Sequence, residues 1–214
     1  IIMTNAVSTR VAIPMLVNNL REPDNTAAYK SLATNIFTNA RKQGFQTAFI
    51  SAQGLEGLSN YIGIHDIDFW EDTQVRPGPQ VAADQVLTPS VETAPINWTK
   101  PFLLVLNSRA PHIPYDKDFP EDQATFSVPR VSDDIRQKQN EYDDAVRYYD
   151  KELASAIRTV LKKSSLPVLV FITSDHGERV GKDGHFGHSI VEIPTAQIPF
   201  LYFSTDPAYR FDRI

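Results

Sequence analysis

The segment SDHGE at 174–178 carries the strongest chemical signal in the sequence. It directly follows the apolar run PVLVFIT, which is typical of a buried strand. A carboxylate and an imidazole at the end of a strand are good ligands for zinc or manganese, so Asp175 and His176 are candidate metal ligands. Gly177 would allow a sharp backbone turn beside the ion, and Glu178 is a candidate for polarising the site from behind these ligands.

Histidines are concentrated in and just after this segment. Three of the five histidines of the chain lie between positions 176 and 188, where even spacing would place far fewer. His185 and His188 belong to the glycine-rich stretch GKDGHFGH. A flexible surface loop would explain a lone histidine, but a cluster that follows a buried strand favours metal binding.

A second predicted strand is also followed by a histidine. The apolar run FLLVLN at 102–107 is typical of a buried parallel strand, and His112 follows it in SRAPH. Ligands of α/β folds bind beyond the carboxyl ends of the strands. His112 is therefore either part of the same site or an ordinary loop histidine, and Arg109 is either a polarising charge or a solvated one.

Thr9 lies near the start of the chain, in the stretch STRVAIP. The local sequence alone favours Thr9 as a helix N-cap. The functional alternative is a nucleophile at a helix N-terminus, where backbone N–H groups and the helix dipole stabilise an alkoxide and an incoming phosphate. A threonine hydroxyl is too weak an acid to attack at neutral pH, and a coordinated metal ion would make it competent.

The elements that would position these residues alternate along the chain. Asp24 or Asn25 would cap the first helix, and Gly44 would end it. We expect strands at 45–51, 102–107, 167–173 and 198–203, helices at 24–44 and about 132–163, and one helical turn at 81–86 within an irregular connection at 72–101. Strands that alternate with helices predict one α/β domain over 1–214, with a mainly parallel sheet sandwiched by helices.

Composition excludes several classes of protein. The chain has 214 residues with a net charge of −5, and its lysines and arginines are scattered, which argues against a nucleic-acid partner. The absence of cysteine excludes disulfides, thiolate zinc sites and cysteine nucleophiles. No apolar run approaches the roughly 20 residues that span a bilayer.

Taken together, these motifs resemble a known family. SDHGE with a glycine-rich loop and His188 resembles the bacterial phosphoethanolamine transferases that modify lipopolysaccharide, and the lipoteichoic acid synthases, within the alkaline phosphatase/sulfatase superfamily. LLVLNSRAPHIPYDKDFP at 103–120 looks like the family's strand, substrate-site histidine and Pro-Tyr loop. NEYDDAVRYYDKEL at 140–153 and QGFQTAFISAQ at 43–53 are similar to the family's later helix and earlier strand. Thr9 stands in the family's relation to an Ile-Pro pair.

The resemblance implies roles for the candidate residues. Thr9 would be the nucleophile and a metal ligand, together with Asp175 and His176. His112 and His188 would bind the substrate or a second metal, while Glu178, Arg109 and His185 would lie behind them. The metal would be zinc, with manganese as the alternative. A phosphoethanolamine group would pass from a phospholipid donor to a cell-envelope glycolipid acceptor through a phospho-threonine intermediate.

The sequence also departs from the family. The family's first metal ligand is an acidic residue on a strand upstream of the threonine, which this chain lacks, so we expect a domain truncated at both ends whose metal can be absent. The C/S-x-P-x-R motif of true sulfatases is missing around Ser8. A phosphoglycerol transferase, a phosphodiesterase or sulfatase-like hydrolase on the same fold, and a non-catalytic binding or regulatory domain remain alternatives. The resemblance further implies a bacterial inner-membrane protein, anchored through segments outside this chain, with this domain in the periplasm or outside the cell.

Overall fold

A three-stranded parallel sheet lies at the centre of the molecule. The computed structural model describes residues 2–22, 24–55, 57–73, 81–127, 134–188 and 190–209. The strands run in the order β3 (Phe69–Glu71), β2 (Gln46–Ser51) and β4 (Phe102–Asn107). In this register, Ala48 of β2 lies opposite Phe69 and Leu104. The strand expected at 102–107 is confirmed, and so is its parallel pairing.

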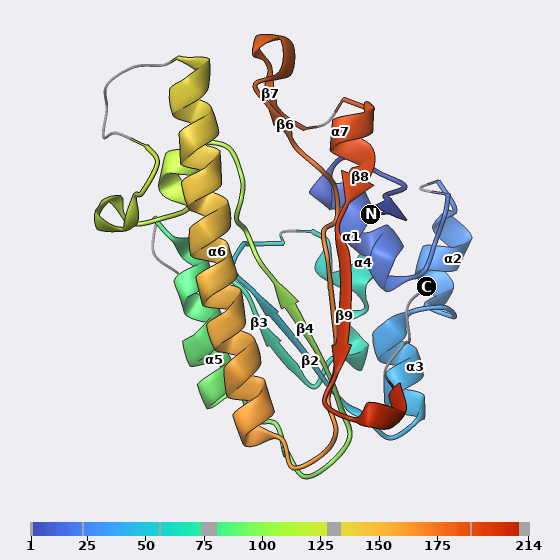
Figure 1. Cartoon of the computed structure of the whole chain (residues 1–214). Coiled ribbons are helices and arrows are strands. Elements are labelled where there is room, and N and C mark those ends of the chain that lie inside the picture. The colour runs from blue at the N-terminus through green and yellow to red at the C-terminus, as the bar shows by residue number, and fades with distance from the viewer. Residues whose placement is uncertain are drawn as a thin grey trace.

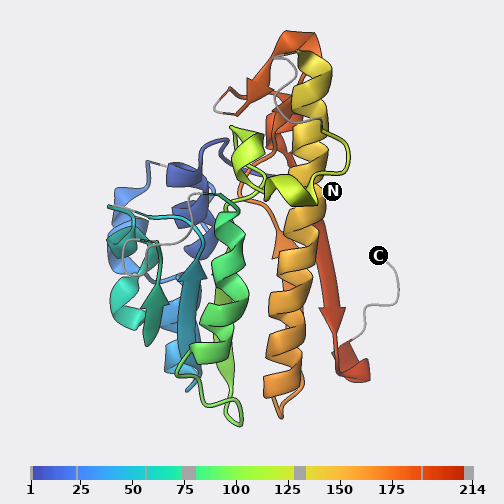
Figure 2. The same ribbon diagram turned by 90° about the vertical axis from the view of Figure 1, so that its left-hand side faces the viewer.

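Helices cover both faces of this sheet (Figures 1 and 2). Side chains alternate between the faces of a strand, so Ala48 and Ile50 pack on one side and Phe49 on the other. The side of Ala48 and Ile50 is covered by α5 (Leu87–Thr93) and α6 (Ile135–Lys163). The side of Phe49 is covered by α1 (Thr9–Val17), α3 (Ile36–Lys42) and α4 (Ser59–Ile62). The predicted α/β class is confirmed.

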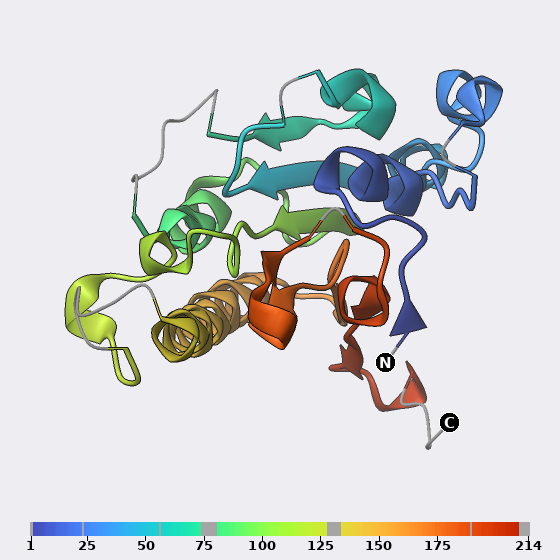
Figure 3. The same ribbon diagram turned by 90° about the horizontal axis from the view of Figure 1, so that it is seen from above.

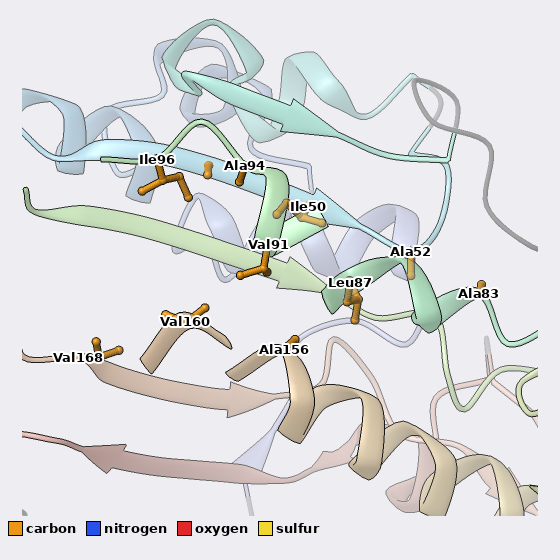
Figure 4. Close-up of a cluster of buried hydrophobic side chains, with 11 residues drawn as sticks. Ile50, Ala52, Ala83, Leu87, Val91, Ala94, Ile96, Ala156, Val160 and Val168 are labelled. Carbon is orange, nitrogen blue, oxygen red and sulfur yellow. The ribbon is translucent and has the colours of Figure 1, made fainter. Parts of the chain in front are cut away.

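The larger core cluster lies between β2, α5 and α6 (Figure 4). Leu87 and Val91 of α5 are fully buried, one turn apart on the same helix face, and Ala156 of α6 is fully buried against them. Burial of the Leu87 and Val91 side chains contributes about 1.5–3 kcal/mol each. This packing fixes α6 along the sheet, and the loops at the ends of α6 are fixed with it.

A second pair of strands stands apart from the central sheet. β5 (Leu169–Thr173) pairs antiparallel with β9 (Phe200–Ser204), and no pairing of β5 with β4 is present among the described residues. The strand expected at 167–173 forms at Leu169–Thr173, but its expected burial is wrong, because Phe171 is 60% exposed. The apolar run indicates a strand. Whether the strand is buried depends on the element that packs against it, which the sequence pattern does not specify.

The strand expected at 198–203 is divided at Pro199. β8 (Gln197–Ile198) pairs with β1 (Ile2–Met3), and β9 begins only after the proline. Proline lacks the N–H that would continue a ladder, so the chain changes partner there. The pairing of β1 with β8 brings the start of the chain beside the segment that follows SDHGE.

Two predicted helical regions differ from the structure. The helix expected at 24–44 is broken into α2 (Thr26–Ser31), capped by Asn25 as expected, and α3, because Leu32 adopts a left-handed conformation. Asn35 accepts hydrogen bonds from the first turn of α3 and starts a new helix. The supposedly irregular connection contains α5, which follows the expected turn at Ala83–Val86. The expected helix start at Ser132 lies outside the described residues.

Two further elements lie at the upper end of the molecule in Figure 1, towards which β2 and β4 point, and Figure 3 looks onto this end from above. A short hairpin of β6 (Arg179–Val180) and β7 (Phe186–Gly187) follows SDHGE, and α7 (Ile193–Ala196) follows the hairpin. None of the helices in the described ranges has the length and apolarity to cross a bilayer.

Candidate active site

Thr9 and His176 meet although they lie 167 positions apart. Thr9 is the first residue of α1, and its Oγ1 lies 3.1 Å from Nε2 of His176. Nδ1 of His176 lies 3.0 Å from the carbonyl oxygen of Gly177, which only accepts, so Nδ1 carries the proton and Nε2 faces the threonine with its lone pair. The alternative role of Thr9 as N-cap is wrong, because Ser8 occupies that position.

Asp175 places a carboxylate oxygen beside the Nε2 atom of His176. Its Oδ2 lies 3.5 Å from Nε2 of His176 and is buried without a hydrogen-bond donor among the described residues. A buried carboxylate oxygen without a partner is costly unless a cation compensates it. Ligands about 2.0 Å from a tetrahedral ion lie roughly 3.3 Å apart, which agrees with both spacings around Nε2. The donor set therefore fits a divalent metal.

Gly177 packs against α7 and fixes the loop behind these donors. Its N–H donates to the carbonyl of Thr195 at 2.7 Å. A Cβ at this position would lie 2.1 Å from the carbonyl oxygen of Pro194. The glycine is thus required by a close approach of two backbones, rather than by the sharp turn that the sequence suggested.

His188 joins the site through Glu178. Nδ1 of His188 lies 2.9 Å from Oε2 of Glu178, and Oε1 of Glu178 accepts a hydrogen bond of 2.7 Å from the hydroxyl of Tyr115. The ring of His188 packs on that of His176 with centroids 4.1 Å apart. Sequence reasoning placed Glu178 behind the site and did not assign Tyr115, which is the functional candidate that it missed.

His112 completes a row of three imidazoles. Its ring centroid lies 5.3 Å from that of His188. Its backbone N–H donates to Asp118 at 2.5 Å, and Asp118 also forms an ion pair with Arg109. Of the two readings left open for His112, the structure favours membership of the site, because the loop that carries it is held against the site by buried acids.

A second buried acid anchors the start of this loop. Asp84, 1% exposed, accepts hydrogen bonds from the backbone of Arg109 and Ala110 and from the hydroxyl of Ser108. Neither Asp84 nor Asp118 was singled out from the sequence, since each acts on a segment distant in the chain.

Two candidates occupy different positions from those expected. His185 is exposed in the turn that connects β6 and β7. Its hydrogen bonds there are made by its backbone, and its side chain does not join the other histidines. Arg109 directs its guanidinium to Asp118 and thereby braces the loop of His112. It acts on the backbone that carries a site residue and does not polarise the metal donors directly.

A cavity of about 320 Å³ opens beside these side chains. It is lined by Ser8, Thr9, Arg10, Gln53, Gly54, Leu55, Leu58, His112 and His188. The volume lies at the lower end of that of small-molecule sites. The cavity is bounded by the N-terminus of α1 and by Arg10, both of which favour an anion.

The electrostatic surroundings distinguish the two cavity histidines. The hydrogen bond to Glu178 raises the pKa of His188 above 6.5, and the nearby carboxylates outweigh the opposing effect of burial. Burial lowers the pKa of His112 below 6.5, and the positive charge of Arg109 adds to this effect. His188 is thus the better proton donor, while His112 favours the neutral form.

A second group of possible metal donors overlaps the first. Nitrogen and oxygen atoms of His176, Glu178 and His188 lie within 4.8 Å of one another. Glu178, however, already meets a donor at each oxygen. To bind an ion directly it would have to release one of these hydrogen bonds.

The chain matches a known protein family. Residues 3–206 match the family model described as Sulfatase. Phosphoethanolamine transferase EptA of Helicobacter pylori is 29% identical over 115 residues, which cover 49% of this chain and 22% of that protein. The expected resemblance to an enzyme family with transferases among its members is confirmed.

Solved structures show the same fold. The C-terminal periplasmic domain of phosphoethanolamine transferase EptC from Campylobacter jejuni has a TM-score of 0.72 at 21% identity, covering 96% of this chain and 66% of that one. The lipoteichoic acid synthase LtaP from Listeria monocytogenes has a TM-score of 0.59 at 16% identity, covering 94% and 55%. The chain therefore spans only part of the length of each protein that it resembles.

Proposed function

Because the chain belongs to the sulfatase family, we propose that it is part of a metal-dependent transferase that moves a phosphoethanolamine group from a phospholipid to a cell-envelope acceptor. The observation that carries the proposal is the convergence of the Thr9 hydroxyl, the His176 imidazole and the partnerless oxygen of Asp175. Similarity to phosphoethanolamine transferase EptA supports the identity of the transferred group.

Thr9, Asp175 and His176 would hold the metal ion. When bound, a divalent cation lowers the pKa of a coordinated hydroxyl and neutralises charge on a transferring phosphoryl group. The donors are nitrogen and oxygen, which suits zinc, and manganese is the alternative. We propose that a further acidic ligand comes from a segment of the protein that precedes these residues.

Two displacements at phosphorus would complete the transfer. In the first, the Thr9 hydroxyl gives its proton to solvent, Oγ1 forms a bond to the phosphorus of the donor head group, the bond to the glycerol oxygen breaks, and diacylglycerol leaves. In the second, an acceptor oxygen attacks phosphorus, the bond to Oγ1 breaks, and Thr9 regains a proton from solvent. The hydrogen bond with Glu178 keeps His188 suited to protonate the glycerol oxygen in the first step and to take the acceptor's proton in the second. Arg10 and the first turn of α1 would bind the phosphate oxygens.

The location of the reaction is also a proposal. EptC contributes a periplasmic domain in the solved structure, and a phospholipid donor lies in a membrane. We therefore propose that the domain works at the periplasmic face of the bacterial inner membrane and that other segments of the protein supply the anchor.

A substitution of the nucleophile tests the proposal. In the protein that carries this domain, Thr9→Ala should lower transfer from head-group-labelled phosphatidylethanolamine by about a thousandfold or more. Mass spectrometry of the wild type should find phosphoethanolamine on the peptide that contains Thr9. Thr93→Ala, at an exposed position of α5, is the matched control and should retain activity.

Two results would count against the proposal. Thr9→Ala protein that still turned over would remove Thr9 from the mechanism. Faster transfer from phosphatidylglycerol than from phosphatidylethanolamine would replace the proposed donor with a phosphoglycerol donor on the same scaffold.

A further inference from the structure

A buried row of hydrogen bonds runs from Tyr115 through Glu178 to His188. The Tyr115 hydroxyl donates to Oε1 of Glu178 at 2.7 Å, and Nδ1 of His188 lies 2.9 Å from Oε2. Tyr115 is 2% exposed, and the Glu178 side chain is 7% exposed. Both oxygens of one carboxylate are therefore engaged away from bulk water, where hydrogen bonds are strong and costly to lose.

The row begins at a rigid point. The ring of Tyr115 packs edge-on against Tyr142 and Phe186, with centroids 5.3 Å and 6.2 Å away. These contacts fix the position of its hydroxyl, and the hydroxyl in turn restrains the Glu178 carboxylate. Glu178 cannot rotate without losing one of its two donors.

The geometry determines which nitrogen of His188 faces the cavity. A carboxylate accepts hydrogen bonds and donates none, so Nδ1 of His188 must carry the proton in this contact. Nε2 is then the nitrogen left to meet a ligand, and His188 lines the cavity together with Thr9. The same arrangement orients imidazoles that act on metals and substrates in many proteins.

We infer that Tyr115 and Glu178 are positioning residues, which hold Nδ1 of His188 so that Nε2 is presented to the phosphoryl group in the cavity. Neither residue touches the reacting atoms. The catalytic consequence rests on the proposed function, whereas the tautomer of His188 is a property of the folded chain and can be measured without substrate.

The rival role for Glu178 is that of a direct metal ligand with His176 and His188. The two roles predict different effects when the charged carboxylate of Glu178 is replaced by a neutral amide. Glutamine still offers an oxygen to Nδ1 of His188 and an amide to the oxygen of Tyr115, so Glu178→Gln preserves a positioning role. As a metal ligand, Glu178 would lose most of its affinity for the ion on the same change.

Long-range ¹H–¹⁵N spectra of the imidazole rings test the inference directly. At alkaline pH, where the rings are neutral, His188 of the wild type should show a protonated Nδ1 and an unprotonated Nε2. Glu178→Gln should keep this pattern, while Glu178→Ala should relax His188 toward a mixture of tautomers. His188→Gln assigns the signals, and His185→Gln, at an exposed position, is the matched control that leaves them unchanged.

Kinetic and binding measurements add the functional readout. Tyr115→Phe keeps the packed ring and removes only the hydroxyl, so it should lower kcat about 10–100-fold with KM and zinc affinity nearly unchanged. A proton on Nε2 of His188 in the wild type, or an unchanged tautomer in Glu178→Ala, would overturn the inference. So would a loss of zinc affinity in Glu178→Gln as large as that in Asp175→Asn. If the tautomers behave as expected and Thr9→Ala remains active, only the proposed function fails.

Discussion

Asp175 has a buried carboxylate oxygen that lacks a hydrogen-bond donor among the described residues. Its Oδ2 is enclosed by protein and receives no hydrogen bond from the described residues. The folded chain therefore carries a desolvation cost at this atom that a cation would remove. If Asp175 is a metal ligand as proposed, its carboxylate destabilises the metal-free fold and stabilises the metal-bound one.

The substitution Asp175→Asn should separate these two effects. Removal of the buried charge should leave the metal-free protein as stable as the wild type or up to about 1–2 kcal/mol more stable. Saturating zinc should stabilise the wild type by about 2.7 kcal/mol at a hundredfold excess over its dissociation constant, and the variant by much less. Thermal unfolding with zinc and with a chelator measures both quantities.

A conservative change elsewhere controls for charge. Asp183→Asn alters an exposed residue in the β6–β7 hairpin whose left-handed backbone suits asparagine. It should leave the zinc response intact. Equal stabilisation by zinc in Asp175→Asn and in the wild type would exclude Asp175 as a ligand.

Among single residues, the sequence predicted the candidate metal donors but not the side chains that hold them in position. Asp175 and His176 stood out because two metal-binding residue types follow an apolar run, and Thr9 because a family pattern ends in Pro14. Tyr115 and Glu178 are 63 positions apart, and nothing in either local sequence predicts that they meet. Contacts of this kind depend on the packing of elements, which a single sequence does not specify.

Among the elements, α6 also organises a loop through one buried acid. Asp144, 1% exposed on α6, accepts hydrogen bonds from the backbone N–H groups of Thr125, Phe126 and Ser127 and from the Ser127 hydroxyl. Burial alone would raise the pKa of Asp144, but these hydrogen bonds outweigh it and lower the pKa below 3.8.

Asp144→Asn should therefore lower the free energy of unfolding by about 2 kcal/mol at neutral pH, because an amide cannot accept from all four donors. A lowered pKa means that the carboxylate stabilises the fold above its unfolded pKa, and this contribution is lost as pH falls through the folded value. The difference between wild type and variant should thus shrink below about pH 4. Urea unfolding across this range measures it, and a constant difference would contradict the assignment.

The contact between the SDHGE loop and α7 gives a steric prediction. Gly177→Ala would place a Cβ 2.1 Å from the Pro194 carbonyl oxygen, so the loop or α7 must move. We expect a loss of about 3 kcal/mol or more, equivalent to a fall in Tm of roughly 6–12 °C, and weaker zinc binding. Differential scanning calorimetry measures the first, and titration with zinc the second.

A Gly→Ala substitution at Gly44 serves as a control, because it strains the backbone without a steric clash. Gly44 has a φ of +80° with open space around it, so Gly44→Ala should cost only about 1 kcal/mol and leave zinc binding unchanged. If Gly177→Ala were no worse than this, the close approach of the two backbones would not constrain the site.

The predicted elements agree with the structure where the hydrophobic pattern of a segment matches the neighbour against which it pairs or packs. The strand at 102–107 has the expected limits because an apolar run and a parallel neighbour coincide. The helix expected at 24–44 failed because Leu32 adopts φ of 50° and Asn35 offers a new cap, although the apolar stripe continues across the break. Periodicity reports a buried face, and it cannot distinguish one helix from two that share that face.

For the whole molecule, the site joins three parts of the chain that are distant in sequence. The start of α1 contributes Thr9, the loop after β4 contributes His112, and the segment after β5 contributes His176 and His188. The pairing of β1 with β8 holds the first part against the third, and so does the hydrogen bond of 2.6 Å that the Thr4 hydroxyl donates to the carbonyl oxygen of Asp175. A ligand bound to all three should therefore stabilise them as one unit.

Hydrogen exchange with and without zinc tests this cooperation. If Thr9, Asp175 and His176 share one ion, zinc should slow amide exchange in the first turn of α1 and in the segment at 173–188 together, because a bound ion resists separation of its ligands. A chelator should reverse both effects, and Thr9→Ala should reduce the protection of α1 more than that of the later segment. The turn at 97–100 lies before β4, at the opposite end of the sheet from the site, and serves as an internal control that should not change. Protection confined to 173–188 would mean that this segment alone binds the ion. It would exclude Thr9 as a metal ligand.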